Sequence, residues 1–336
     1  MNFKKIHNYH RLEYFSIKFF NNPQVYSIQV KNMTDIPKNH PRYESLSARE
    51  QITAGVEKGI TSRQGLIAQG RGEAFDYFIG EKTIESADYA EAVALCLLLL
   101  AKNPVISVNG NAAALAPAEL VELAQLTGAA LEVNLFHRTE ERVKKIIDTL
   151  KENGADVVLG ENAEPLLELD HERSKVERTG IYDADVIFVP LEDGDRCQVL
   201  ANMNKLVIAV DLNPLSRTAQ TAHVSIIDNL KRAVPNMIQM ISEFKNMNEA
   251  DLWEIVGAYD NKIVLADAIE TIKETLTAEQ NKILGIEDKK DNTNSGAGKK
   301  SDYDTKRTDA RKAARIQRNA EIARKVMSRG GDLMME

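Results

Sequence analysis

The stretch PVISVNGN, Pro104 to Asn111, decides the fold of this 336-residue chain. Its first part, up to Asn109, is a β-branched, uncharged run that predicts a buried strand. The Gly110-Asn111 pair predicts a tight turn, and an Ala/Leu-rich helix containing residues 118–126 follows it. Another apolar run, residues 130–136, comes next. A strand, a helix and a second strand in this order predict two parallel neighbours in one sheet.

The same alternation extends outward on both sides of this stretch. Helical segments are expected before it, and a further helix opens at Thr139, where a hydroxyl cap precedes two acids. Because helices separate several of the strands, the sheet should be largely parallel and covered on both faces. We predict an α/β, Rossmann-like fold with N-terminal helical segments and a C-terminal helical extension. The remaining expected helices are 47–59, 83–102 and 230–244, with a pair of helices over 249–284, and the remaining strands are 156–159, 185–189, 206–210 and 223–227.

Charge is divided unevenly along the chain, whose formal net charge is −7. Residues 1–32 carry +4 and residues 288–336 carry +5, which leaves −16 on residues 33–287. We predict that residues 1–32 are a disordered extension or the product of a misplaced start. Residues 33–287 should form the α/β domain, residues 288–307 a polar linker and residues 308–336 a basic helical tail. Nothing resembles a nucleic-acid recognition module, so nucleic acid is not an expected partner.

Apolar runs and cysteines restrict the cellular setting. The longest uncharged apolar run, residues 92–101, has ten residues, whereas a membrane span needs about 20. Membrane insertion is therefore not expected. The two cysteines, Cys96 and Cys197, cannot form a disulfide framework, and no spacing suggests zinc. A reducing, cytoplasmic location is the expectation.

Polar residues follow four of the predicted strands directly. Ligands of open parallel sheets bind beyond the carboxyl ends of the strands, so these loops should share one edge. Their arginines and backbone N–H groups favour a polyanion site. The four loops are 109–111 (NGN), 137–139 (HRT), 192–196 (EDGDR) and 211–218 (DLNPLSRT).

Each loop also has a simpler interpretation. Residues 109–111 fit an ordinary strand-to-helix turn, His137 fits the end of a strand, and the EDGD run fits a solvated turn. Gly70-Arg71-Gly72 begins like a dinucleotide fingerprint, but Phe75 replaces the third glycine and no strand precedes it. The common edge of the four loops is what favours a binding site.

Longer motifs resemble the archaeal phosphopantothenate synthetases, the 4-phosphopantoate:beta-alanine ligases. The resemblance covers roughly residues 35–285 and leaves both ends outside. One departure is Gln69, where the family pattern has a histidine. The motifs are residues 40–46 (HPRYESL), 65–77 (GLIAQGRGEAFDY), 106–111 (ISVNGN), 132–142 (EVNLFHRTEER), 189–196 (VPLEDGDR) and 209–218 (AVDLNPLSRT).

This resemblance implies an ATP-dependent ligase of coenzyme A biosynthesis that acts as a homodimer. It would join 4-phosphopantoate to beta-alanine and release AMP and pyrophosphate. Carried over by motif, the ATP contacts are Arg49, Arg71, Asp211, Leu212, Asn213, Arg217, Thr218, Asn229 and Leu230. The expected phosphopantoate contacts are Asn109, Gly110, Asn111, His137 and Arg138.

The chemistry favours an acyl adenylate, because a carboxylate is a poor electrophile for an amine. Arg71, Arg217 and Mg²⁺ would stabilise the charge that grows on the phosphate oxygens. Asp193 and Asp195 are the candidate Mg²⁺ ligands, since Mg²⁺ uses one or two carboxylates beside substrate phosphates. His137 is the candidate base for the beta-alanine ammonium, with the same two acids as alternatives. One competing hypothesis is a non-catalytic module that senses a nucleotide or coenzyme A. The other is a nucleic-acid-associated protein that binds through its two basic ends.

Overall fold

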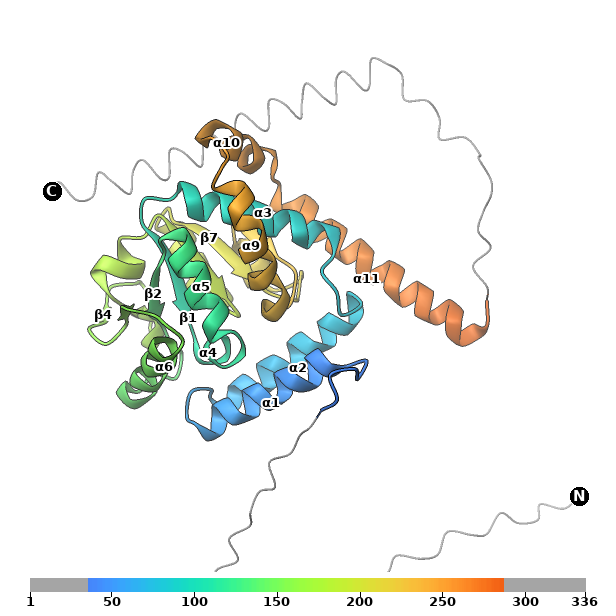
Figure 1. The fold of residues 1–336 in the computed structure, drawn as a ribbon, viewed down its shortest axis with the longest axis horizontal. Coiled ribbons are helices and arrows are strands. Elements are labelled where there is room, and N and C mark those ends of the chain that lie inside the picture. Colours follow the sequence, from blue (N-terminus) through green and yellow to red (C-terminus); the bar gives the residue numbers. More distant parts are fainter. Residues whose placement is uncertain (1–35, 287–336) are drawn as a thin grey trace, which may run out of the picture.

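The computed structural model describes residues 36–286, and the predicted extension, linker and tail (1–32, 288–307 and 308–336) lie outside them. Six strands form one parallel sheet in the order β3-β2-β1-β6-β7-β8 (Figure 1). This arrangement confirms the predicted α/β, Rossmann-like fold. The strands are β1 (Pro104–Val108), β2 (Ala130–Val133), β3 (Val158–Leu159), β6 (Val186–Pro190), β7 (Leu206–Val210) and β8 (Val224–Ile226).

Both faces of the sheet are buried, as the unbroken apolar runs predict. Alternate residues of a strand enter opposite core clusters: Ile106 and Phe188 belong to one cluster, Val105 and Ile187 to the other. The first cluster packs against α3 (Glu85–Leu100), α5 (Pro117–Thr127), α6 (Glu140–Glu152) and α9 (Leu230–Phe244). The second packs against α7 (Gly194–Asn202), with the short helix α8 (Arg217–Thr221) nearby.

The turn predicted at Gly110-Asn111 is wrong, because a helix begins there. The side chain of Asn109 accepts hydrogen bonds from the backbone N–H groups of Asn111 and Ala112, at 3.1 and 3.0 Å. This cap starts α4 (Gly110–Leu115) directly after β1. Pro117 then opens α5, since proline is tolerated in the first turn of a helix.

Several elements have no counterpart among the predicted ones. The helix α2 (Arg63–Phe78) contains three glycines, which lower helix propensity and hide it from a pattern search. Between β3 and β6 the chain forms a small antiparallel pair and two short irregular turns. These are β4 (Glu164–Pro165), β5 (Lys175–Val176), η1 (Glu172–Ser174) and the π-helical η2 (Arg178–Tyr182).

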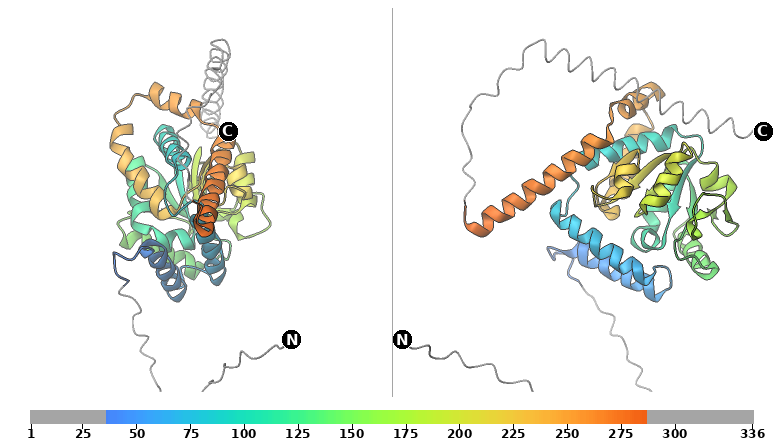
Figure 2. Two further views of the ribbon diagram at one scale, coloured as in Figure 1. Left: turned by 90° about the vertical axis from the view of Figure 1, so that its right-hand side faces the viewer. Right: turned by 180° about the vertical axis from the view of Figure 1, so that it is seen from behind.

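Helices outside the sheet layers complete the described part of the chain. α1 (Tyr43–Glu57) and α2 form a pair beyond the end of the sheet, and α1 packs on both α2 and α4 (Figures 1 and 2). α10 (Glu249–Ala258) leads into α11 (Asn261–Leu284), whose C-terminal half projects from the body of the molecule. None of the helices between residues 36 and 286 has the length and apolarity that crossing a bilayer requires.

Candidate active site

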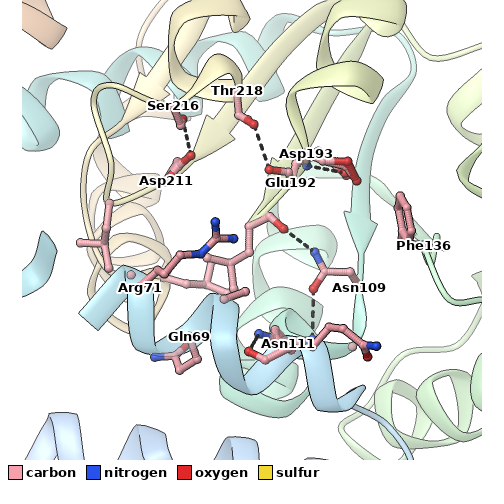
Figure 3. A pocket seen from close by; sticks show the side chains of 18 of the residues that line it. Gln69, Arg71, Asn109, Asn111, Phe136, Glu192, Asp193, Asp211, Ser216 and Thr218 are labelled. Carbon is pink, nitrogen blue, oxygen red and sulfur yellow. Dashed lines mark hydrogen bonds between the residues drawn. The ribbon is translucent and has the colours of Figure 1, made fainter. Parts of the chain in front are cut away.

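A pocket with a volume of about 780 Å³ lies at the carboxyl ends of β1, β2, β6 and β7. The loops after these strands form one side of it, and α2 forms the other (Figure 3). Residues of all four loops identified in the sequence line this pocket. Its size lies within the range of about 300–1,000 Å³ that is usual for small-molecule sites.

Asn109 joins two of the loops. While its side-chain oxygen caps α4, its side-chain nitrogen donates to the main-chain oxygens of Pro190 (2.8 Å) and Leu191 (3.1 Å). The residue is only 7% exposed, so these bonds form away from bulk water. Asn109 therefore fixes the end of β1 against the end of β6.

Close backbone contacts bring α2 to the pocket. A Cβ atom on Gly110 would lie 2.4 Å from the main-chain oxygen of Ile60, so a larger residue cannot occupy this position without displacement. Thr61 donates its hydroxyl to the oxygen of Gly110 (3.0 Å), and Asn111 donates its amide to the oxygen of Gly65 (2.9 Å). The start of α2 is thus held on the start of α4.

The loop after β7 is fixed by its own aspartate. The Asp211 carboxylate accepts from the hydroxyl of Ser216 (2.5 Å) and the backbone N–H of Asn213 (2.9 Å). Burial raises the pKa of Asp211, while these hydrogen bonds oppose the shift. Thr218 donates its hydroxyl to the oxygen of Glu192 at 2.9 Å, which joins this loop to the one after β6.

Four arginines line the pocket: Arg71, Arg142, Arg173 and Arg217. Arg71 reaches into it from α2 (Figure 3). Because guanidinium groups stay protonated and present forked donors, this lining suits phosphate and carboxylate ligands.

Arg173 belongs to a buried charge network. Its guanidinium lies 2.6 Å from a carboxylate oxygen of Glu192 and 2.7 Å from one of Asp193. Glu192 also pairs with the fully buried Arg196, which donates to the hydroxyl of Ser107 at 3.1 Å. Burial opposes ionisation of Glu192, but the charges of Arg173 and Arg196 outweigh it and hold the pKa of this carboxyl below its usual value.

Most of the residues predicted for the site are brought together in this pocket. They are Arg71, Asn109, Gly110, Asn111, His137, Asp193, Asp211, Leu212, Asn213, Arg217, Thr218, Asn229 and Leu230. His137 is exposed, and its ring packs edge-on against Phe136 with the ring centroids 5.0 Å apart. The imidazole is therefore open to a ligand.

Three predicted residues do not line the pocket. Arg49 pairs with Glu73 at 2.5 Å on the α1–α2 pair. Arg138 donates to the main-chain oxygen of Gly160 at 2.7 Å, and only 3% of its side chain is exposed. Asp195 is exposed and lies 2.7 Å from Arg217.

Sequence reasoning missed Arg142 and Arg173. Arg142 lies in the first turn of α6, and its side chain reaches back to donate to the main-chain oxygens of Ile60 (2.9 Å) and His137. Its position within the EVNLFHRTEER motif was the available signal. Arg173 lies in η1, between strands too short to predict, so no periodic pattern marked it. Gln69 also lines the pocket.

The two acids proposed for magnesium do not meet at one position. Asp193 lines the pocket but already pairs with Arg173, and Asp195 lies outside the lining. Within residues 36–286 there is no group of three or more His, Cys, Asp or Glu residues that could hold a metal ion. These two residues therefore do not fit a shared magnesium site.

Comparisons with known proteins assign the chain to a family. Residues 86–275 match the family model described as phosphopantothenate/pantothenate synthetase. A 4-phosphopantoate–beta-alanine ligase of Methanosarcina mazei is 60% identical over 244 residues, which is 73% of this chain and 96% of the relative. The ligases of that name from Thermococcus kodakarensis and Methanospirillum hungatei are 52% identical over 247 residues and 47% identical over 241 residues. These alignments span 73% and 72% of this chain and 95% and 98% of the relatives. The chain thus belongs to the phosphopantothenate/pantothenate synthetase family.

Proposed function

We propose that this chain is a 4-phosphopantoate–beta-alanine ligase of coenzyme A biosynthesis, with ATP as a substrate. The observation that carries the proposal is the pocket itself, which lies at the ends of four parallel strands and is lined by four arginines. Relatives that are 47–60% identical to this chain carry this name, and the alignments cover nearly their whole length. A phosphorylated acid and a triphosphate are both polyanions, and such a lining suits them.

The proposed division of the pocket follows its two ends. ATP would lie between Arg71 of α2 and the loop after β7, with Asn229 and Leu230 at the start of α9 completing its contacts. Phosphopantoate would lie at the ends of β1 and β2, against residues 109–111 and His137. Arg142 and Arg173, at this second end, would replace the buried Arg138 as contacts for its negative charges.

The proposed reaction has two steps. A carboxylate oxygen of phosphopantoate attacks the α-phosphorus of ATP, pyrophosphate leaves, and an acyl adenylate forms. Arg71 and Arg217 would stabilise the charge on the phosphate oxygens, which is commonly the largest contribution to such catalysis. The amine of beta-alanine then attacks the acyl carbon, and AMP leaves with the bridging oxygen.

Beta-alanine must lose a proton before it attacks, because an alkylammonium has a pKa of about 10. His137 is the proposed acceptor, since it lines the pocket and its ring is exposed. Magnesium would supply charge neutralisation to the phosphates of ATP. Asp193 is the one of the two predicted acids that lines the pocket, and no step of this mechanism is routed through it.

We also propose a homodimer in the cytoplasm. The α2 helix exposes 68% of Ile67, 41% of Leu66 and 42% of Tyr77, which favours a protein contact over this helix. Both cysteines are free and buried, as in proteins of reducing compartments.

The experiment is a substrate-dependence test on the purified chain. Pyrophosphate should exchange into ATP only when phosphopantoate is present, and full turnover should yield AMP. Detection of ADP and phosphate would instead show an acyl phosphate and discard the adenylate. Calorimetry that detects ATP or coenzyme A binding without AMP release from all three substrates would favour the sensing module.

A further inference from the structure

Asp76 is the only buried residue of the 16-residue helix α2. The other residues of this helix are exposed or half-buried, including its apolar side chains. A helix normally buries an apolar stripe, so a single buried carboxylate is an unusual means of attachment. Burying a carboxylate is unfavourable unless it is paired, and its partners therefore show what holds α2 in place.

The partners of Asp76 all come from the first turn of α9. One carboxylate oxygen accepts from Nη2 of Arg232 at 2.5 Å. The other accepts from Nη1 of Arg232 at 3.2 Å and from the side-chain amide of Asn229 at 2.9 Å. A forked pair of this kind fixes direction as well as distance.

Arg232 is itself held from the opposite side. Its Nε and Nη2 atoms donate to Asp228 at 2.9 and 2.5 Å, and Asp228 also accepts from the hydroxyl of Thr83 at 2.6 Å. Asp228 lies in the segment between β8 and α9 and is 1% exposed. The guanidinium of Arg232 therefore connects α2 to a buried carboxylate that follows the last strand of the sheet.

This attachment lies next to the pocket. Arg71 precedes Asp76 by five residues on α2, a rise of about 7.5 Å at 1.5 Å per residue. Asn229, the other partner of Asp76, lines the same pocket as Arg71 and caps α9 by accepting from the N–H of Lys231 at 3.1 Å. At its other end, α2 is held by the bond from Asn111 to Gly65. The pocket-facing part of α2 thus lies between two points of attachment.

We infer that Asp76 is a positioning residue, which sets Arg71 against the phosphates of ATP by holding α2 to the first turn of α9. This inference rests on the proposed use of Arg71 and Asn229 as ATP contacts. Asp76 does not line the pocket, so its effect on the nucleotide must pass through these two residues. A purely structural ion pair would affect stability but would not be coupled to Arg71.

The test is a double-mutant cycle on ATP affinity, measured by calorimetry with ATP and magnesium chloride on the full chain. Asp76→Asn should weaken ATP binding about tenfold, because the amide cannot pair with both guanidinium nitrogens. Arg71→Ala should weaken it at least as much. The double variant should be no more than about twofold weaker than Arg71→Ala, since Asp76 would act mainly through Arg71 and only the small remaining loss would pass through Asn229. Independent losses that multiply would overturn the inference.

Asp185→Asn is the matched control. Asp185 is also a buried aspartate, 3% exposed, and it accepts from the backbone N–H groups of Lys102 and Asn103 at 2.8 and 3.0 Å. Asp185 precedes β6 at the end of the sheet opposite the pocket. The Asp185→Asn variant should therefore have a lower melting temperature and an unchanged ATP affinity. An equal loss of ATP affinity in this control would show that general destabilisation explains the Asp76 result.

Two further measurements separate the possible failures. If Asp76→Asn does not fold, Arg232→Lys removes the forked pair while keeping the charge, and it should also weaken ATP binding.

In turnover assays, Asp76→Asn should raise the KM for ATP and leave the KM for beta-alanine unchanged. A wild-type chain that forms no AMP but shows the coupled ATP affinities would discard the ligase and keep the positioning role. Normal ATP affinity in Asp76→Asn would discard the positioning role alone.

Discussion

Asn109 and Pro190 are joined by a hydrogen bond of 2.8 Å from the side-chain amide of one to the main-chain oxygen of the other. The bond connects the ends of two neighbouring parallel strands, β1 and β6. The same side chain also starts α4, so one residue sets both the loop contact and the helix cap. The pocket depends on both.

We expect Asn109→Ala to destabilise the protein by about 2–4 kcal/mol, from a lost cap and an unpaired buried carbonyl. Urea unfolding measures this change. Asn248→Ala is the control, because Asn248 caps α10 outside the pocket, and its loss should be about 1 kcal/mol. Equal losses in the two variants would show that the bond to Pro190 contributes nothing beyond the cap.

We expect Arg217→Ala to slow AMP formation on the order of 10²-fold, because it removes a donor to the transition-state phosphate. Arg217 and its partner Asp195 are both exposed, at 69% and 61%, so their ion pair adds little to stability. Asp195→Ala should therefore keep both the melting temperature and most of the rate. A near-normal rate in Arg217→Ala would refute its assigned role.

The strands and helices of the sheet were predictable because apolar periodicity encodes them. Residues 206–210 were predicted as a strand and form β7, and Thr139 caps α6 as its hydroxyl predicted. The six-strand parallel sheet follows from such local signals. What was not predictable depends on contacts between distant residues: α2 lacks an apolar stripe, and its single buried residue is Asp76.

The same distinction applies to the site. Residues that follow a strand directly, such as Asn109 and Asp211, were identified because strand ends define the pocket edge. Arg173 was missed because it reaches the pocket from an irregular segment, held there by Glu192 and Asp193. Arg138 was expected beside the substrate because the family motif carried it over with His137, yet its side chain turns to Gly160. A sequence gives the position of a side chain along a loop but not its direction.

Glu192→Gln should destabilise the protein by about 3–5 kcal/mol, because it leaves Arg173 and Arg196 close together without the carboxylate between them. Urea unfolding at pH 7 checks the value. Asp195→Asn, in the same loop but exposed, should change stability by less than about 0.5 kcal/mol. A Glu192→Gln variant as stable as the wild type would show that the carboxylate charge is not needed to hold the two guanidinium groups together.

If the proposed dimer forms through α2, a charge on the exposed apolar surface of this helix should separate the two subunits. Ile67→Glu would place a charge on its exposed apolar surface and should halve the mass measured by light scattering after gel filtration. Ile283→Glu is the control, since Ile283 is 81% exposed at the far end of α11. A wild-type chain that elutes as a monomer would contradict the proposed dimer.

The stability of the protein should depend on pH through the ionisation of Glu91. It is fully buried in α3, and burial, with repulsion from Asp228 as a smaller cause, raises its pKa to about 8. In the unfolded chain the pKa returns to the ordinary value of a glutamate, 4.5. Between these two values the folded state holds a proton that the unfolded state has released, so Glu91 lowers stability progressively as the pH rises.

Glu91→Gln removes this titration, and the variant should therefore gain stability relative to the wild type as the pH rises from about 4.5 to about 8. The gain should be a few kcal/mol in total, at up to about 1.4 kcal/mol per pH unit. Urea unfolding at intervals between pH 5 and 8.5 measures it.

Glu73→Gln is the control. Hydrogen bonds, of which the one from Arg49 is the largest cause, lower the pKa of Glu73 to about 2, so the contribution of Glu73 to stability changes only below about pH 4.5. The difference between Glu73→Gln and the wild type should thus stay constant over the measured range. Parallel curves for Glu91→Gln and the wild type would show that Glu91 ionises at its ordinary pKa, and that the Asp228 side of α3 is hydrated.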